Sequence, residues 1–272
     1  MTIRWDPRLS VNALSSRSWT LRQDLDCYER LGIERITVNL PKLLDAGLDD
    51  AVAEISGRGL HVDGILAGSA FDLCDEGSWP RTRDAMITAI DVARRLGAST
   101  LQTTGGSAGG RPYEWAVDQF VRACAPVVSA AAEAGIRMAL EPTRPQFAHV
   151  GFVHTLREGV ALARDLGIWL VPDTAHIWWE PDVAGLLASA AAGPLLAAVQ
   201  VADLAFGAPV LERLVPGDGA VPIASMLSVT LEAGFEGPFE LEIIGGAIES
   251  EGYESALERS LAYLTVLLAG QD

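Results

Sequence analysis

The segment AGIRMALEP, residues 134–142, carries the pattern that decides the fold. Its glycine is typical of a residue that ends a preceding helix in the left-handed conformation. A short apolar run follows, of the kind that is buried on both faces in a parallel sheet. The same order of glycine, apolar run and polar residues recurs along the chain, at 31–39, 58–68, 96–106, 166–173 and 234–243, with a looser version at 191–203 and an opening strand at 8–13.

Amphipathic segments lie between these runs, and they predict helices over 81–96, 114–134, 155–166 and 254–268. Eight strands, each followed by a helix, divide the 272 residues into units of about 34. This count predicts an α/β protein with one eight-stranded parallel (β/α)8 barrel, a TIM barrel, in a single domain over 1–272. The alternative is a doubly wound open sheet, but the chain lacks the glycine fingerprint and the Walker A sequence typical of that class.

The charge balance narrows the classes of partner. The chain has 36 acidic and 20 basic residues, a net charge of −16, which disfavours nucleic acid and anionic membranes. Three cysteines without a CxxC pair predict a reducing compartment, the cytoplasm. The first residues lack the apolar stretch of a signal peptide, and no apolar run is long enough to span a membrane.

Polar residues stand where the last four predicted strands end. They are Glu141, Asp173, Gln200 and Glu242, at spacings of 32, 27 and 42 residues. Barrel enzymes place their sites at this end of the strands, where side chains of neighbouring strands converge. Three carboxylates at one point repel one another, and a divalent cation such as Mn²⁺, Mg²⁺, Co²⁺ or Zn²⁺ would resolve the conflict.

Two questions stay open on residue patterns alone. Any single acid at a strand end could instead cap the following helix. Glu240 shares a pleat face with Glu242, so strand periodicity does not choose between these two. Asp203 likewise follows Gln200 closely and offers another oxygen ligand.

The chain resembles the xylose isomerase-like barrel superfamily of sugar isomerases and epimerases, which shares its fold with endonuclease IV-type enzymes. The resemblance rests on GIRMALEP (135–142), DTAH (173–176), VQVAD (199–203), GDG (217–219) and GFEGPFELE (234–242). It places the family glutamate at Glu242. It also implies one divalent metal ion held by Glu141, Asp173, Gln200 and Glu242. Gln200 stands where histidine is common, as in the hydroxypyruvate isomerase branch, although the loop that follows departs from that branch.

The resemblance further implies the chemistry. Glu141 and Glu242 would move a carbon-bound proton beside a carbonyl through an enediolate, and His176 would face substrate oxygens. Trp178, like Trp179, could form a wall over a sugar or cyclitol ring. Arg213 or Arg144 could grip the substrate, although a surface role is the default for both. Lys42, the only lysine, is expected to be a solvated loop residue.

The expected activity is a metal-dependent isomerase or epimerase acting on a small, sugar-like hydroxy-carbonyl compound. The alternative is a dehydratase of the keto-cyclitol or dehydroshikimate type, or a carbon-glycoside-cleaving lyase, since both share the early enolate chemistry. Four histidines and the acidic charge disfavour a repair endonuclease. A non-catalytic barrel would be expected to lose some of the oxygen ligands. The resemblance is also compatible with a homo-oligomer.

Overall fold

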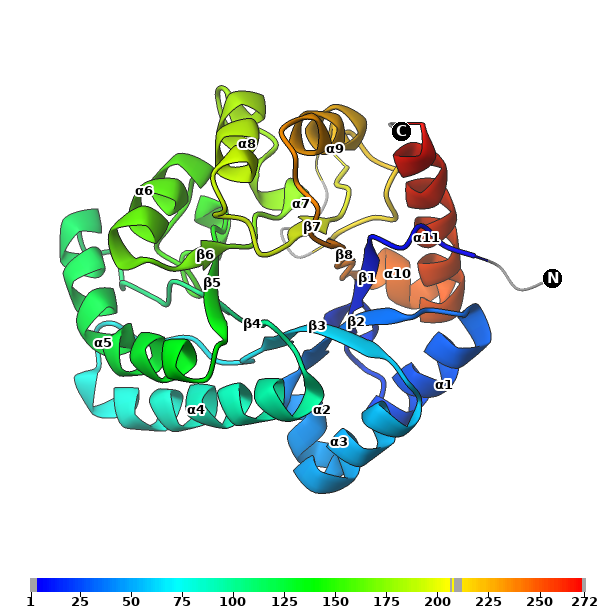
Figure 1. The fold of residues 1–272 in the computed structure, drawn as a ribbon. Helices are drawn as coiled ribbons and strands as arrows, with labels where there is room; N and C mark the ends of the chain where they lie inside the picture. Colours follow the sequence, from blue (N-terminus) through cyan, green and yellow to red (C-terminus); the bar gives the residue numbers. More distant parts are fainter. Residues whose placement is uncertain (1–3, 206, 208–211, 271–272) are drawn as a thin grey trace.

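A ring of parallel strands forms the centre of the molecule (Figure 1). The structure is a computed structural model and describes residues 4–205, 207 and 212–270. The strands run in the order β6-β5-β4-β3-β2-β1-β8-β7. Isolated parallel bridges between Leu170 and Leu196, and between Asp173 and Gln200, join the two ends of this order. The predicted (β/α)8 barrel is therefore confirmed. The strands are β1 (Leu9–Asn12), β2 (Arg35–Asn39), β3 (His61–Leu66), β4 (Thr100–Thr104), β5 (Arg137–Glu141), β6 (Trp169–Leu170), β7 (Val199–Val201) and β8 (Phe239–Leu241).

Helices surround this ring and bury its outer face (Figure 1). The four helices predicted from amphipathic patterns begin and end within two residues of the expected positions. The α-helices are α1 (Leu21–Leu31), α2 (Leu40–Ala46), α3 (Leu48–Gly57), α4 (Trp79–Leu96), α5 (Tyr113–Glu133), α6 (Leu156–Leu166), α7 (Thr174–Ile177), α8 (Val183–Ala192), α9 (Ile223–Glu232), α10 (Gly246–Glu251) and α11 (Tyr253–Ala269). Short 3₁₀ helices are η1 (Ala13–Ser16), η2 (Glu76–Ser78) and η3 (Pro145–Phe147).

Helix α6 shows how the sequence sets these boundaries. The Thr155 hydroxyl oxygen accepts a hydrogen bond from the backbone amide of Glu158, and the Glu158 carboxylate accepts one from the backbone amide of Thr155. This capping box satisfies amide groups that have no partner inside the helix. Gly167 then ends the helix with a left-handed φ of 65°, a conformation that costs glycine little. Strand β6 follows directly, so the cap fixes where the strand toward Asp173 begins.

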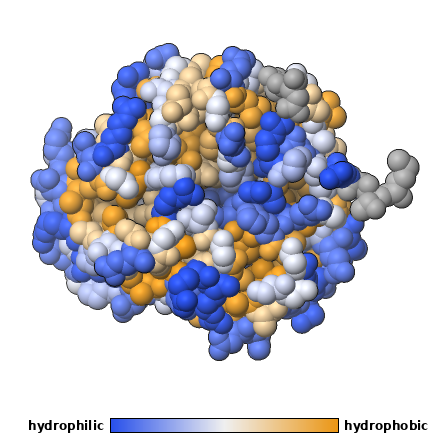
Figure 2. All heavy atoms as spheres, viewed as in Figure 1, coloured by the Kyte–Doolittle hydropathy of each residue, from blue (hydrophilic) through white to orange (hydrophobic). Residues whose placement is uncertain are grey.

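Hydrophilic and apolar residues are interspersed over the face of the molecule drawn in Figure 2. Within the described part of the chain, no helix is both long and apolar enough to cross a membrane.

Candidate active site

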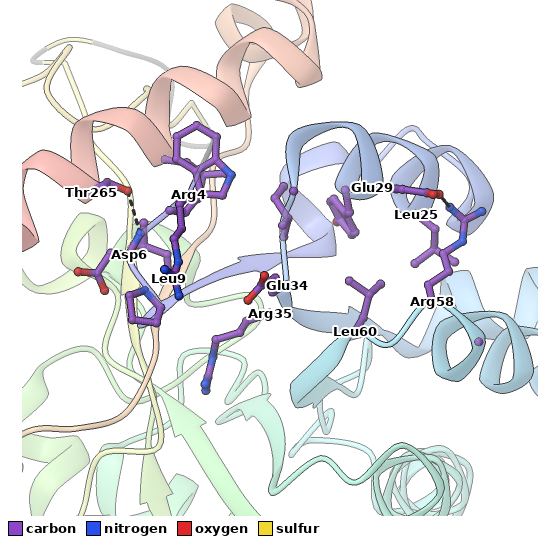
Figure 3. A pocket seen from close by; sticks show the side chains of 17 residues that line it. Arg4, Asp6, Leu9, Leu25, Glu29, Glu34, Arg35, Arg58, Leu60 and Thr265 are labelled. Carbon is purple, nitrogen blue, oxygen red and sulfur yellow. Dashed lines mark hydrogen bonds and ion pairs between the residues drawn. The ribbon is translucent and has the colours of Figure 1, made fainter. Parts of the chain in front are cut away.

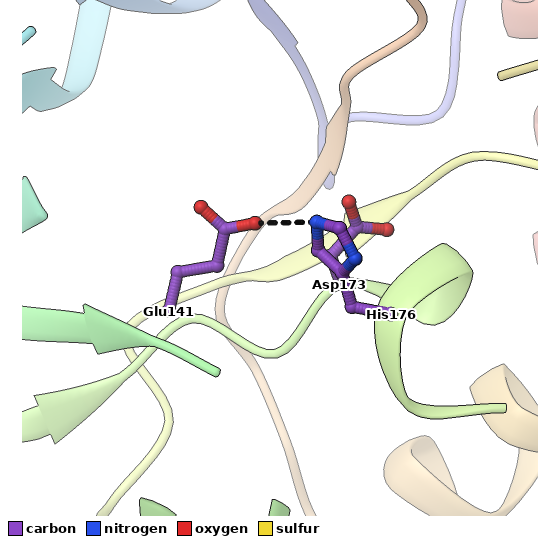
Figure 4. Close-up of side chains that lie close together, drawn as sticks. All are labelled: Glu141, Asp173 and His176. Atoms are coloured by element: carbon purple, nitrogen blue, oxygen red, sulfur yellow. Dashed lines mark ion pairs between the residues drawn. The ribbon is translucent and has the colours of Figure 1, made fainter. Parts of the chain in front are cut away.

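Three donor side chains meet at the carboxyl ends of β5 and β6. Glu141 is the last residue of β5, Asp173 follows β6 after a short turn, and His176 lies in α7. All three are buried, and one ligand atom of each lies within 4.8 Å of the others. The imidazole of His176 faces the Glu141 carboxylate, with Nε2 3.3 Å from Oε1 (Figure 4). These residues form a candidate site for a divalent metal ion.

Asp173 has two structural roles at once. Its Oδ1 accepts a hydrogen bond of 2.8 Å from the Ala175 backbone and so caps α7. Its Oδ2 accepts a bond from Arg213 Nη2. One oxygen of Asp173 therefore caps the following helix, as the sequence allowed, while its other oxygen faces the site. The cap also orients α7, which carries His176 one turn further on.

Arg213 is not a surface residue, which corrects the default expectation. Its side chain lies buried among the predicted ligands, and Nη1 donates to Glu242 Oε1 at 2.7 Å. Its Nη2 donates to Asp173, lies 3.1 Å from His176 Nε2 and 3.9 Å from Glu141 Oε1. The guanidinium therefore provides positive charge at the centre of the carboxylates.

Two side-chain amides hold the second carboxylate oxygen of Glu242. Gln200 Nε2 donates to Glu242 Oε2 at 2.8 Å, and Asn12 Nδ2 donates to the same oxygen at 3.0 Å. The amide nitrogen of Gln200 thus faces the carboxylates, while its Oε1 is buried and has no hydrogen-bond partner. A buried oxygen without a donor is suited to a cation. Sequence reasoning missed Asn12, although it ends β1 and the strand-end rule applies to it equally.

Glu240 lies deeper in the barrel than Glu242 and is fully buried. Its carboxylate accepts hydrogen bonds from the side chains of Asn12, Thr37, Gln102 and Gln200. Two of these donors, Asn12 and Gln200, also hold Glu242. Glu240 is therefore a positioning group below the site, which explains why the strand carries two glutamates on one face.

Burial changes the proton affinity of the acids. It raises the pKa of Glu141 above its usual range, and the nearby Asp173 carboxylate adds to that rise. Burial likewise raises the pKa of Glu242, although the Arg213 guanidinium opposes the change. A raised pKa favours the protonated form of each acid, which reduces the repulsion among the carboxylates. Buried acids of this kind are candidates for proton transfer near neutral pH.

His176 is neutral in this environment. Burial lowers the pKa of its imidazole to about 4. A guanidinium has only donors, so the contact from Arg213 requires Nε2 to accept and places the proton on Nδ1. An unprotonated Nε2 is also the form of imidazole that binds a metal ion.

Asp203 is committed to backbone groups. Its Oδ1 accepts bonds from the amides of Leu204 and Val221, and its Oδ2 accepts bonds from Gly217 and Gly219. Three of these bonds attach residues 217–221 to the end of β7. Of the two residues considered on this strand, Gln200 is therefore the one whose side-chain oxygen lacks a partner.

The position of Lys42 corrects a second expectation from the sequence. It lies in α2, is 9% exposed, and donates to Asp24 Oδ2 at 2.6 Å and to the carbonyls of Ala13 and Ser16 at 2.9 Å. A buried, fully bonded ammonium is not the solvated loop lysine expected from the sequence. Its partners lie in α1 and η1, so it fixes the turn that follows Asn12.

Aromatic residues support His176 from outside. The Trp179 Nε1 donates to the His176 carbonyl at 2.7 Å. The ring of Phe147 meets the His176 ring edge-on at 4.9 Å, and the Arg144 guanidinium lies over Phe147. Trp178 is half-buried and packs against the main hydrophobic core. Its role as a wall for substrate stays a prediction.

A cavity of about 1000 Å³ lies at the opposite end of the barrel, where the strands begin (Figure 3). Its walls include residues that precede β1 and β2, among them Arg4, Trp5 and Glu34. Two lining arginines are already paired, Arg35 with Asp63 and Arg58 with Glu29. Because barrel enzymes react at the other end of their strands, this cavity is not the catalytic site.

The donor set fits a divalent ion by its chemistry. Ligand atoms about 2.0–2.2 Å from one ion lie at most roughly 4.4 Å apart, close to the separations found among Glu141, Asp173 and His176. Carboxylates with one neutral imidazole suit Mn²⁺, Co²⁺ or Zn²⁺. The orphaned Gln200 oxygen adds to the fit. Arg213 does not fit such a site, because its positive guanidinium bonds to carboxylates that would hold the ion.

Comparison with solved structures gives three informative relatives. The protein SMc04130 from Sinorhizobium meliloti 1021 is 25% identical, with a TM-score of 0.84 over 94% of this chain and 96% of that one. The IolI protein, solved with a bound zinc atom, is 18% identical, with a TM-score of 0.85 over 97% and 99%. A D-allulose 3-epimerase from Methylomonas sp. is 18% identical, with a TM-score of 0.77 over 98% and 100%.

Curated protein sequences gave no match to this chain. A family model, in contrast, matches most of it, over residues 25–265. The matched range contains β2 to β8 and every candidate ligand described above. On this match, together with the eight-stranded barrel, the chain belongs to the family of xylose isomerase-like TIM barrels.

Proposed function

We propose that this protein is a divalent-metal-dependent isomerase or epimerase of a small ketose, cyclitol or related hydroxy-carbonyl compound. One observation carries the proposal. Two buried glutamates, Glu141 on β5 and Glu242 just after β8, both reach the guanidinium of Arg213, from strands that are three positions apart in the ring. Two acids that converge on one small volume are the arrangement needed to remove a proton and return it.

Glu141, Asp173, His176, Gln200 and Glu242 would hold the ion. When bound, a Mn²⁺, Mg²⁺, Co²⁺ or Zn²⁺ ion supplies Lewis-acid stabilisation of negative charge on substrate oxygens. The metal-bound IolI structure and the D-allulose 3-epimerase support this class of site and of substrate, as relatives of the same fold.

The side chains of this chain perform the proton transfers. One glutamate takes the carbon-bound proton as a carboxylate, and the other glutamate returns a proton to the same carbon on the same or the opposite face. The neutral His176 carries a proton on Nδ1, which is buried without a hydrogen-bond partner, and a contact of His176 with a substrate oxygen stays a prediction.

The proposal also covers the charge of the substrate, the cellular compartment and the oligomeric state. The charge of −16 favours a small neutral substrate over nucleic acid, and three unpaired cysteines are in keeping with the cytoplasm. Two copies could associate, as the resemblance implies, and the oligomeric state is a separate measurement.

The test is solvent exchange. Protein loaded with Mn²⁺ is incubated with ketoses and keto-cyclitols in deuterated water, and deuterium at the carbon beside the carbonyl is measured by mass spectrometry. Glu141→Gln and Glu242→Gln are expected to lower the exchange rate at least ~100-fold, since each removes a proton-transfer group. Glu258→Gln, on the exposed face of α11, is the matched control.

The outcome also separates the alternatives. Loss of water or cleavage of a carbon–glycoside bond, without incorporation into recovered substrate, assigns the site to a dehydratase or lyase. Exchange that persists in both glutamine variants rejects the assignment of the two glutamates.

A further inference from the structure

The guanidinium of Arg213 stands where the candidate ligands converge. It bonds to Glu242 at 2.7 Å and to Asp173, and it lies 3.1 Å from Nε2 of His176. The residue is 8% exposed, and the carboxylates around it are buried. A fixed positive charge in this position offsets part of the repulsion among the acids.

The backbone of Arg213 is attached to the barrel itself. Its amide donates to the carbonyl of Ile244, just after β8, at 2.6 Å. The next residue, Leu214, exchanges two backbone hydrogen bonds with Asp203, just after β7. Asp203 is in turn held by four backbone amides. The main chain therefore keeps Arg213 at the barrel mouth, and only its side chain can leave the site.

A metal ion and this guanidinium require the same atoms. Asp173 Oδ2 and Glu242 Oε1 both accept from Arg213, and His176 Nε2 faces it. An ion about 2.1 Å from those atoms would lie in contact with the guanidinium nitrogens. Two cations at such a distance repel strongly in a buried site. Joint occupancy is therefore unfavourable.

We infer that Arg213 is the internal counter-cation of the metal-free site and competes with the divalent ion for Asp173 and Glu242. Metal binding then requires the guanidinium to withdraw from the carboxylates. The inference rests on the proposed function, because it concerns the divalent ion proposed for that site. It adds a side chain that controls how readily the site binds the ion. The apparent metal affinity then depends on the fraction of metal-free molecules in which the Arg213 guanidinium has left Asp173 and Glu242.

The magnitude follows from population arithmetic. Suppose that Arg213 bonds to the carboxylates in about nine-tenths of the metal-free molecules. Only the remaining tenth can then bind the ion, so removal of the guanidinium lowers the apparent Kd for the metal about tenfold. Arg213→Lys keeps the charge but cannot donate to two carboxylates through a planar fork. Its affinity is expected to fall between those of the wild type and Arg213→Gln.

The experiment is titration calorimetry with MnCl₂ on chelator-treated protein. The wild type, Arg213→Gln and Arg213→Lys are compared with Arg58→Gln as the matched control. Arg58 also sits among three carboxylates, those of Asp26, Glu29 and Glu54, but on the outside of the barrel. The Tm of each protein is measured in chelator and in Mn²⁺. Arg213→Gln is expected to melt below the wild type in chelator, and Mn²⁺ is expected to narrow that gap.

Each result either supports or overturns the competition between Arg213 and the metal ion. A Kd at least tenfold tighter in Arg213→Gln, unchanged in Arg58→Gln, supports competition. Equal Kd values in the wild type and both Arg213 variants overturn the inference and leave the proposed function standing. A lack of Mn²⁺ binding in all four proteins overturns both together. If Arg213→Gln does not fold, the comparison of the wild type with Arg213→Lys carries the same decision.

Discussion

Replacement of Lys42 by methionine should strongly destabilise the protein. Methionine has a similar length and no charge, so it removes the ammonium while it keeps most of the volume. The Asp24 carboxylate, which is 0% exposed, would lose its donor at 2.6 Å. Two carbonyl oxygens, those of Ala13 and Ser16, would lose bonds of 2.9 Å.

The expected cost follows from those losses. Removal of one partner of a buried ion pair costs about 3–5 kcal/mol, because the other charge stays buried. A domain of this size loses about 2–4 °C of Tm for each kcal/mol. The Tm of Lys42→Met should therefore fall by about 6–20 °C. The carboxylate of Asp24 keeps one donor, the Ser16 hydroxyl, which favours the lower half of the range.

The assay is thermal unfolding followed by circular dichroism, arranged as a double-mutant cycle. Asp24→Asn removes the negative charge but keeps the shape, so the double variant should recover about 1–3 kcal/mol of the loss in Lys42→Met. Arg259→Met, which breaks exposed ion pairs with Asp218 and Glu251, should shift Tm by less than ~2 °C. A Tm of Lys42→Met within ~2 °C of the wild type would refute the reasoning.

Three further outcomes are expected. As the pH rises from about 4.5, the usual pKa of a glutamate, to about 8, Glu141 and Glu242 should contribute progressively less to the stability of chelator-treated protein, because their raised pKa values make the folded state bind more protons than the unfolded one. Glu141→Gln should flatten that slope in urea unfolding measured at several pH values. Gln200→Ala should weaken Mn²⁺ binding by roughly 10–100-fold in calorimetry, as it removes an orphaned oxygen and one of the two amide donors that position Glu242. An unchanged Kd would reject Gln200 as a ligand. Asp203→Asn should lower the stability by about 1–3 kcal/mol in urea, since an amide group would then face two backbone donors, and Asp218→Asn on the exposed surface should not.

The barrel was predictable because its signals are local. Glycine caps, short apolar runs and amphipathic helices repeat at each unit, and neighbouring units have little freedom in how they pack. The strand-end rule also named Glu141, Asp173, Gln200 and Glu242, which the structure brings together around Arg213 or its immediate partners.

The remaining parts depend on contacts between distant segments. Arg213 follows β7 by more than ten residues, and a side chain at such a position can fold inward or face solvent. Lys42 is buried only because Asp24, 18 residues earlier, lies beside it. Neither pairing has a local spacing rule, so composition and periodicity favoured the surface for both.

The burial of Lys42 has a practical consequence for amine chemistry. It is the only lysine of the chain, and its ammonium is engaged in three hydrogen bonds. Burial lowers the pKa of Lys42 and also keeps reagents away from its amine. In the folded protein an acylating reagent should therefore spare this side chain. The rate at which Lys42 becomes acylated then reports how often the barrel opens, with no engineered label.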